Sequence, residues 1–276
     1  MKVGLIAIAR MENSYIKEFC DYYLNLGFDN IIIYDNNRTG EESFDTVLSD
    51  YINNNKVLIM NVRDQKNCQM AAYNHAIDTF TDYFDFMAFF DVDEYLTLSN
   101  NFDNIKDYLS LPCFSDKDII HINWRIYGDC GNIRKTEGLL RDRFPFPLPI
   151  TQTDSYKFSE NFHIKSILNT SINKDKTLKF DTQPHTPVIL KDTTKVCNNK
   201  GNLVFERAYP WNDINYDYAY IKHYKTKSLE EFYRNKMKIG RIDNEDFKIT
   251  MDNFWSINEK TQEKIDFLSL LEKENQ

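Results

Sequence analysis

The chain has 276 residues, and its 42 Asp and Glu against 34 Lys and Arg give a formal net charge of −8. This acidic balance disfavours a general nucleic-acid binder. The 14% aromatic content argues against disorder, and the length is enough for one large domain with a substantial core. The five cysteines are scattered and form no Cys-x-x-Cys pair, so neither a zinc site nor a disulfide framework is predicted.

The N-terminal apolar run, Val3 to Ala9, is too short for the core of a signal peptide with its cleavage site. No apolar segment approaches the ~20 residues that a membrane span needs. We therefore expect a reducing, cytoplasmic location.

In chain order, the first ninety residues alternate between strand and helix patterns. Apolar runs predict strands over residues 2–9, 30–34, 56–61 and 84–90, of which the first and the last are predicted to be buried. Apolar stripes and capping residues between them predict three helices: one that Asn13 or Ser14 caps and that exits at Gly27, one over 43–51, and one over 67–80. Such alternation is typical of a doubly wound α/β layer with right-handed crossovers.

After Tyr95 the pattern changes. A helix is predicted over 101–111 and a strand over 118–127, and residues 128–202 are irregular, with short strand candidates at 162–168 and 187–190. Residues 218–224 form a last predicted strand, Ser228 and Glu231 open a helix to Ile239 as a capping box, and 259–271 is a terminal helix. An irregular, aromatic second half suggests a variable substrate-binding region beside a nucleotide-binding half.

Basic residues concentrate between Lys222 and Arg241, where seven of them stand against two Glu. An ordinary helix surface explains this as well as a cationic face does. If the substrate is lipid-linked, such a face would meet anionic headgroups, each basic residue contributing roughly 1 kcal/mol, and the protein would lie peripherally at the inner face of the membrane.

Three carboxylates, Asp91, Asp93 and Glu94, follow the strand predicted over 84–90. Open α/β sheets bind ligands at the carboxyl ends of their strands. If the chain stays extended, Asp91 and Asp93 project the same way, and a hard divalent cation would bind one or both. A solvated turn is the alternative. An aspartyl phosphatase also has Asp-x-Asp after an apolar strand, but Tyr95 and the three preceding strands depart from that pattern.

The ends of the first, second and fourth strands converge in this topology. They carry Arg10-Met11-Glu12, Asp35-Asn36-Asn37 and the acidic cluster, which together suit a ligand with a base, a ribose and a diphosphate. No Gly-x-Gly-x-x-Gly or Walker motif is present, so a dinucleotide dehydrogenase or P-loop enzyme has no support. His223 is either a third metal ligand or a structural histidine.

The sequence resembles glycosyltransferase family 92 and its bacterial family 2-like relatives, which have the nucleotide-sugar-binding GT-A fold. The resemblance rests on ordered segments from residue 4 to about residue 241: Arg10-Met11-Glu12, Leu26-Gly27-Phe28-Asp29, Tyr34-Asp35-Asn36, Gln69 with Tyr73, Phe90-Asp91-Val92-Asp93-Glu94-Tyr95, Asn123-Trp124, Tyr127-Gly128, Gly131, Lys165-Ser166-Ile167, His185, and Lys222-His223-Tyr224-Lys225-Thr226-Lys227-Ser228 with Glu231-Phe232, Lys236 and Gly240.

The resemblance implies one GT-A domain over residues 1–276, with a mixed central sheet flanked by helices. Residues 1–98 would form the nucleotide-sugar-binding half, 99–241 an irregular acceptor-side half, and 242–276 a C-terminal helical tail. It also implies that Mn²⁺ or Mg²⁺ is held by Asp91, Asp93 and His223. The donor would be bound by Arg10, Glu12, Asp35, Asn37, Gln69, Asp91, Lys165, Lys225 and Lys227.

An inverting mechanism, with a carboxylate base at the acceptor hydroxyl, is what the resemblance favours. The base is not fixed by the sequence; the candidates are Glu94, Asp129, Glu160, His185 and Asp213. Trp124 and Trp211 would stack on acceptor sugars, or simply fill the core.

We therefore expect a metal-dependent glycosyltransferase that moves a sugar from a UDP-sugar to a glycan or lipid-linked acceptor, in surface polysaccharide or glycoconjugate synthesis. The resemblance suggests UDP-galactose as a donor. A non-catalytic sugar-nucleotide or glycan-binding module is the alternative from another class, followed by the Asp-based phosphatase.

Overall fold

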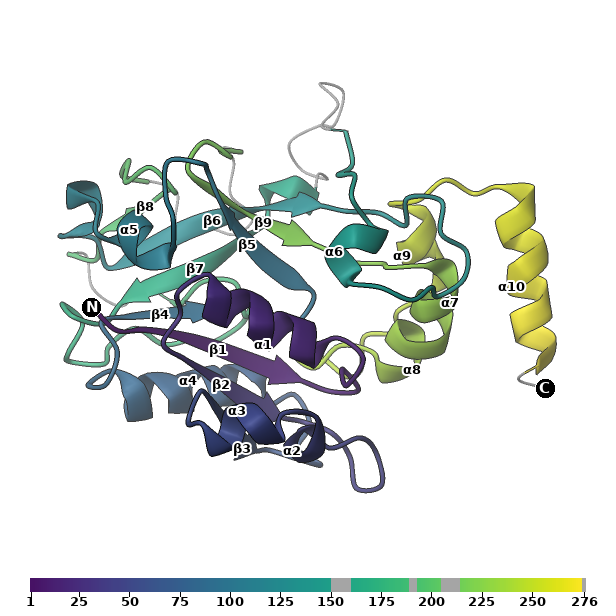
Figure 1. The fold of residues 1–276 in the computed structure, drawn as a ribbon, viewed down its shortest axis with the longest axis horizontal. Helices are drawn as coiled ribbons and strands as arrows, with labels where there is room; N and C mark the ends of the chain where they lie inside the picture. The colour runs from purple at the N-terminus through teal and green to yellow at the C-terminus, as the bar shows by residue number, and fades with distance from the viewer. Residues whose placement is uncertain (150–159, 189–192, 205–213, 275–276) are drawn as a thin grey trace.

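The computed structural model describes residues 1–149, 160–188, 193–204 and 214–274. Within these ranges helices surround a mixed sheet (Figure 1). Its strands are β1 (Val3–Ala9), β2 (Asn30–Asp35), β3 (Val57–Asn61), β4 (Phe86–Phe89), β5 (Glu94–Leu98), β6 (Ile119–Ile126), β7 (Ile164–Asn169), β8 (Val196–Cys197) and β9 (Ala219–His223). The helices are α1 (Ile16–Asn25), α2 (Phe44–Val47), α3 (Ser49–Asn53), α4 (Gln69–Phe80), α5 (Ile105–Leu109), α6 (Leu140–Arg143), α7 (Leu229–Glu231), α8 (Met237–Ile239), α9 (Met251–Trp255) and α10 (Gln262–Glu274), with short turns η1 (Pro112–Phe114), η2 (Glu160–Phe162) and η3 (Phe232–Lys236).

The sheet has the order β3-β2-β1-β4-β7-β6-β9-β5, and β8 pairs with β6. The first four strands are parallel, as the alternating pattern predicts, while β7 runs antiparallel to β4 and β5 antiparallel to β9. The sheet thus draws strands from both predicted halves of the chain. The predicted α/β class with a mixed central sheet is confirmed.

Two apolar layers hold the helices on the sheet. Along β1, Leu5 and Ala7 belong to the cluster under α1, and Ile6 and Ile8 belong to the cluster under α4. The alternation follows from the period of two along a strand. The predicted stripe of α1 is confirmed, because its residues Ile16, Phe19, Cys20 and Tyr23 are all buried.

Several predicted boundaries were wrong. Neither Asn13 nor Ser14 caps α1: Tyr15 occupies the N-cap without a side-chain cap, and the Glu12 carbonyl accepts the N–H groups of Tyr15 and Ile16 at 2.9 and 2.8 Å. The helix predicted over 43–51 is two short helices, α2 and α3. Strand β5 was not predicted, because Glu94 was assigned only to the acidic cluster. The strand candidate at 187–190 falls partly outside the described residues.

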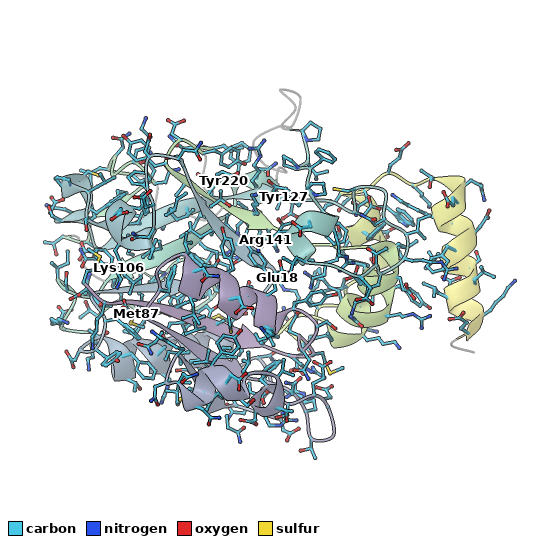
Figure 2. All side chains as sticks on the ribbon, viewed as in Figure 1. Glu18, Met87, Lys106, Tyr127, Arg141 and Tyr220 are labelled. Carbon is cyan, nitrogen blue, oxygen red and sulfur yellow. The ribbon has the colours of Figure 1, made fainter. Side chains whose placement is uncertain are left out.

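Helix α6 is attached to α1. The Arg141 guanidinium lies 3.1 Å from the Glu18 carboxylate and over the Tyr22 ring, and Figure 2 shows the two charged side chains facing each other. The contact holds α6 against the first helix.

The capping box predicted at Ser228 and Glu231 is present, and the helical stretch that it opens runs to Ile239. Within it, η3 is a π-helical turn, and Gly240 ends the stretch at a φ of 75°. A positive φ suits glycine because it has no Cβ. No helix among the described residues is long and apolar enough to cross a membrane.

Helix α10 is attached by apolar and ionic contacts. Phe267 and Leu271 join a cluster with Leu229, and the Lys264 ammonium lies 2.5 Å from the Asp129 carboxylate, with both side chains buried. Asp129, a candidate base, therefore anchors the C-terminal tail in the structure.

Lys264→Met should lower the free energy of unfolding by about 3 kcal/mol, because it leaves the buried Asp129 carboxylate without its counter-charge. Urea unfolding measures the loss. The double variant Asp129→Asn with Lys264→Met should recover most of it, since no lone charge remains buried. A double variant as unstable as the single one would contradict this account.

Candidate active site

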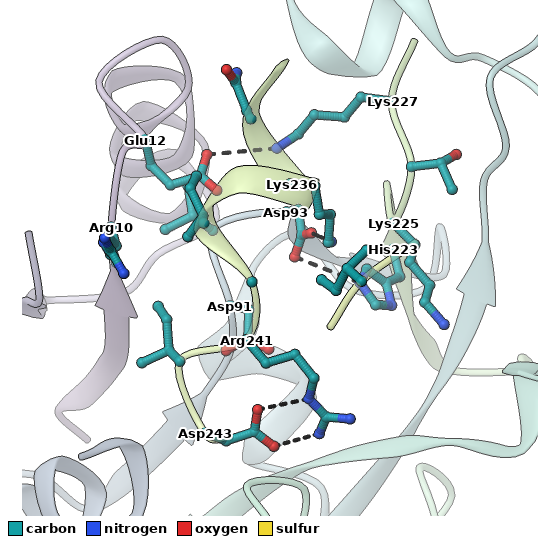
Figure 3. Close-up of a pocket in the computed structure, with 18 of the residues that line it drawn as sticks. Arg10, Glu12, Asp91, Asp93, His223, Lys225, Lys227, Lys236, Arg241 and Asp243 are labelled. Carbon is teal, nitrogen blue, oxygen red and sulfur yellow. Dashed lines mark hydrogen bonds and ion pairs between the residues drawn. The ribbon is translucent and has the colours of Figure 1, made fainter. Parts of the chain in front are cut away.

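A cavity of about 390 Å³ lies where β1 and β4 end, and residues from the segment 223–253 form its other wall (Figure 3). From the first half of the chain it is lined by Arg10, Glu12, Gln69, Asp91 and Asp93. The second half adds Trp124, Glu160, His163, His185, His223, Lys225, Lys227, Lys236, Arg241 and Asp243. Strand ends and the C-terminal segment thus meet at one place, as the topology predicts for the strand ends.

The chain turns between β4 and β5 instead of staying extended: the Glu94 N–H donates to the Asp91 carbonyl at 3.0 Å. Asp91 and Asp93 nevertheless line the same cavity. The Asp91 carboxylate accepts hydrogen bonds from Gln69 at 3.1 Å and Lys165 at 2.7 Å. It is thus held from the side of α4 and β7.

Asp93 lies beside His223 and Lys236 (Figure 3). Its carboxylate lies 2.8 Å from the Lys236 ammonium and 3.6 Å from Nε2 of His223. Burial alone would raise the pKa of Asp93, but Lys236 and His223 hold it well below its ordinary value. Burial lowers the pKa of His223, against the pull of Asp93, which favours the neutral imidazole that binds metals.

Strand pairing brings His223 to this position. In the antiparallel pair of β5 and β9, Glu94 stands opposite His223, and the Tyr224 N–H donates to the Asp93 carbonyl at 2.9 Å. The β5–β9 register therefore sets the distance between His223 and the acidic turn, which is formed by Asp91 to Glu94.

A buried ion pair lies beneath the cavity. The Glu94 carboxylate accepts the Asp91 N–H at 2.9 Å and lies 3.6 Å from the Lys165 ammonium. Burial raises the pKa of Glu94 well above its ordinary value, whereas Asp91 and Glu94 raise the pKa of Lys165 despite its burial. Neither Glu94 nor Lys165 lines the cavity.

The other cations of the cavity are also paired with carboxylates. Lys225 lies 2.6 Å from Glu160, and Lys227 lies 3.6 Å from Glu12. Burial raises the pKa of Glu12, and it lowers the pKa of Lys225 against the pull of Glu160. The oxygens of an anionic ligand would therefore replace these carboxylates as the partners of Lys225 and Lys227.

The seven basic residues between Lys222 and Arg241 do not share one outward face. Four of them line the cavity: Lys225, Lys227, Lys236 and Arg241. Arg234 instead pairs with Glu230 and Glu274 at 3.1 and 2.8 Å.

Trp124 lines the cavity inside a cluster of imidazoles. The His163 ring stacks on it at 5.0 Å with an interplanar angle of 7°, and the His223 ring meets it edge-on at 4.2 Å. His185 lies 5.1 Å away. Imidazoles therefore cover the indole, and its Nε1 is buried and has no hydrogen-bond partner among the described residues. The stacking of Trp124 on an acceptor sugar stays a prediction.

Some predicted site residues lie elsewhere. Asp35 accepts hydrogen bonds from Arg63 at 2.8 Å and from the Asn37 side chain at 2.7 Å, and Asn37 in turn accepts the Met11 N–H at 2.8 Å. Neither Asp35 nor Asn37 lines the cavity, and their donor-binding role stays a prediction. Trp211 and Asp213 lie outside the described residues.

The cavity residues that sequence reasoning missed as site residues include His163, Lys236, Arg241 and Asp243. Two signals were available. Lys236 and Arg241 belong to the basic segment, and Lys236 lies on the helical stretch that the capping box opens. No local pattern distinguishes them from surface lysines and arginines.

The model of the family described as glycosyltransferase family 92 matches residues 8–266. The chain belongs to glycosyltransferase family 92. The resemblance read from the sequence is thereby confirmed, and with it the assignment to the GT-A fold class. The comparison with curated proteins gave no match for this family 92 chain.

Among solved structures, the chain is similar to S. aureus TarS 1-349 in complex with UDP-GlcNAc, at 13% identity over 93% of this chain and 64% of that one, with a TM-score of 0.47. It is also similar to TarS 1-349 in complex with UDP, at 16% identity, 66% and 50% coverage and a TM-score of 0.42. A third is the mannosyltransferase PcManGT from Pyrobaculum calidifontis in complex with GDP-Man and Mn2+, at 12% identity, 75% and 58% coverage and a TM-score of 0.37. The chain spans about half the length of the TarS 1-349 structure.

The donor atoms in the cavity of this family 92 chain suit a divalent cation. Asp91, Asp93 and His223 offer carboxylate oxygens and a neutral imidazole, which Mn²⁺ accepts. The described residues nevertheless contain no preassembled group of three His, Cys, Asp or Glu around a metal position. Each aspartate is instead paired with a lysine, Asp91 with Lys165 and Asp93 with Lys236. A metal cation would therefore bind by replacing an ammonium group.

Asp93→Asn should lower the free energy of unfolding, because the neutral amide cannot pair with Lys236. The depressed pKa of Asp93 means that this contribution is present above the ordinary value of 3.8 and is lost as the pH falls through the folded-state pKa. The stability difference between wild type and variant should be constant from about pH 5 to 7 and shrink below about pH 4.

Urea unfolding at a series of pH values tests this, with the exposed Asp103→Asn as the matched control. A difference that grows as the pH falls would mean that Asp93 does not act through its charge.

Proposed function

We propose that this chain is a metal-dependent glycosyltransferase that transfers a sugar from a UDP-sugar to a glycan or lipid-linked acceptor, with inversion, in the synthesis of a surface polysaccharide or glycoconjugate. The observation that carries the proposal is the cavity at the ends of β1 and β4 of a family 92 chain, where Asp91, Asp93 and His223 meet a set of lysines. UDP-galactose is the donor to test first.

The residues of the cavity match the charge of the proposed substrate. A nucleoside diphosphate leaves with negative charge, and Lys225, Lys227 and Arg241 offer cations on the wall opposite β4. Mn²⁺ or Mg²⁺, held by Asp91, Asp93 and His223, would supply further electrostatic stabilisation of that leaving group. Arg10 is held in place by a bidentate pair with Glu41 at 2.7 and 2.9 Å and lines the end of the cavity near β1.

We propose Glu160 as the base that accepts the proton of the acceptor hydroxyl. Among the described candidates only Glu160 and His185 line the cavity, and Glu160 is the more exposed. Burial alone would raise the pKa of Glu160, but Lys225 lowers it, so the carboxylate is ionised at neutral pH. Glu94 and Asp129 do not line the cavity, and both are buried beside lysines, Lys165 and Lys264.

Family membership favours this proposal over the aspartyl phosphatase. A binding module that kept the fold without turnover is the remaining alternative. Release of UDP separates the two, since a binding module retains the donor intact.

Incubating the protein with a panel of UDP-sugars and Mn²⁺ should release UDP from one of them, faster with acceptor than without. Asp91→Asn and Asp93→Asn should each lower this rate by about 100-fold, because each removes a carboxylate from the proposed cation site. Asp103→Asn is the control and should match wild type. Unchanged turnover in both variants with excess chelator would reject the metal-dependent mechanism.

Glu160→Gln should lower kcat by about 100-fold while leaving UDP affinity within about twofold of wild type, because a base acts on the acceptor and not on the nucleotide. Turnover and calorimetric UDP binding are measured on the same preparations. His185→Gln is the matched variant. If it loses kcat and Glu160→Gln does not, the base is assigned wrongly.

A further inference from the structure

Asp91 and Asp93 each form an ion pair with a lysine, and the two lysines differ in how much of their side chain is buried. Lys165 lies on β7 with a fully buried side chain, 2.7 Å from Asp91 and 3.6 Å from Glu94. Lys236 lies on the cavity wall, 2.8 Å from Asp93, and 30% of its side chain is exposed. Lys165 is therefore a fixed charge, whereas the ammonium of Lys236 can leave its carboxylate for solvent.

The position of Lys236 depends on an unusual backbone segment. It is the last residue of the π-helical turn η3, which interrupts the helical stretch between α7 and α8. A π turn adds one residue to a helical turn, so it changes which side chain faces the cavity, and such turns occur frequently at functional sites. Asp93 and the facing carboxylates of Glu12 and Asp91 attract the ammonium.

We propose that Lys236 is the exchangeable counter-ion of Asp93. It neutralises this buried carboxylate while no divalent cation is bound, and it is displaced when a cation binds there. The released ammonium then pairs with the diphosphate of the nucleotide; this second step rests on the proposed function, and the first does not.

Two consequences follow from the exchange. Without nucleotide, the cation must compete with an ammonium already 2.8 Å from the carboxylate, so its affinity is reduced. With nucleotide, the displaced ammonium gains an anionic partner, and nucleotide and cation therefore bind cooperatively. Removing the charge of residue 236 should strengthen cation binding alone and weaken the cooperativity.

The test is direct Mn²⁺ binding to the full chain, followed by electron paramagnetic resonance of the free ion, which needs no turnover. Lys236→Gln should bind Mn²⁺ about tenfold more tightly than wild type, the size expected for losing one partly exposed charge beside the site. Lys236→Arg keeps the charge and should stay within about twofold of wild type. Lys238→Gln removes a charge from an exposed side chain of the same stretch and should also stay within about twofold.

Adding UDP should tighten Mn²⁺ binding to wild type by about tenfold or more and tighten it less in Lys236→Gln. A second measurement on wild type uses ¹⁵N-labelled lysine: Mg²⁺ should shift the ammonium signal that Lys236→Arg removes and leave that of Lys165 in place. It also covers the case in which Lys236→Gln does not fold.

Equal or weaker Mn²⁺ binding by folded Lys236→Gln would overturn the proposal, as would an ammonium signal unmoved by Mg²⁺. Absence of Mn²⁺ binding in both proteins would overturn it as well. Failure of every UDP-sugar to turn over would reject the proposed function and leave the metal-binding result standing, so the two failures are distinguishable.

Discussion

Buried negative charge at the end of β4 is the constraint on which the rest of the site depends. Asp93 and Glu94 are both largely removed from water, and isolated carboxylates in such surroundings are costly. The fold compensates them with Lys165 from β7 and Lys236 from the C-terminal segment. Neither lysine is near the acidic turn in sequence, so the turn can be stable only when the second half of the chain has folded around it.

This dependence explains why the C-terminal segment both packs in an apolar cluster and lines the cavity. Phe232 packs with Leu229 and Phe254 in a separate apolar cluster, and four residues later Lys236 reaches Asp93. Glu231 joins the same region to α1 and α6 through Tyr15 and Arg143. The cavity wall is thus anchored to the core on one side, and its other side presents charged side chains that can change partners. Such a surface suits a charged ligand.

Local patterns were sufficient to predict the first half of the fold. The strands β1, β2 and β4 are largely buried apolar runs, because both faces of the parallel sheet are covered there, and the helices α1 and α4 show buried residues at the helical period. At the edge of the sheet, β3 buries only Val57. The acidic turn, His223 and the basic residues were also visible as motifs. What could not be predicted was the pairing of β5 with β9, since Glu94–Leu98 reads equally well as the end of a loop.

The same limit applies to the charges. Asp35 ends β2 much as Asp91 follows β4, yet its carboxylate accepts hydrogen bonds from Asn37 and from Arg63, which comes from the loop after β3. Lys165 lies on a buried strand and points at carboxylates, whereas Lys225, on the polypeptide just after β9, faces the cavity. Which carboxylate meets which cation is decided by strand register and by one π turn, and both are properties of long-range packing. A motif identifies the residues able to bind a metal or a phosphate, and the folded chain decides which of them are already engaged with each other.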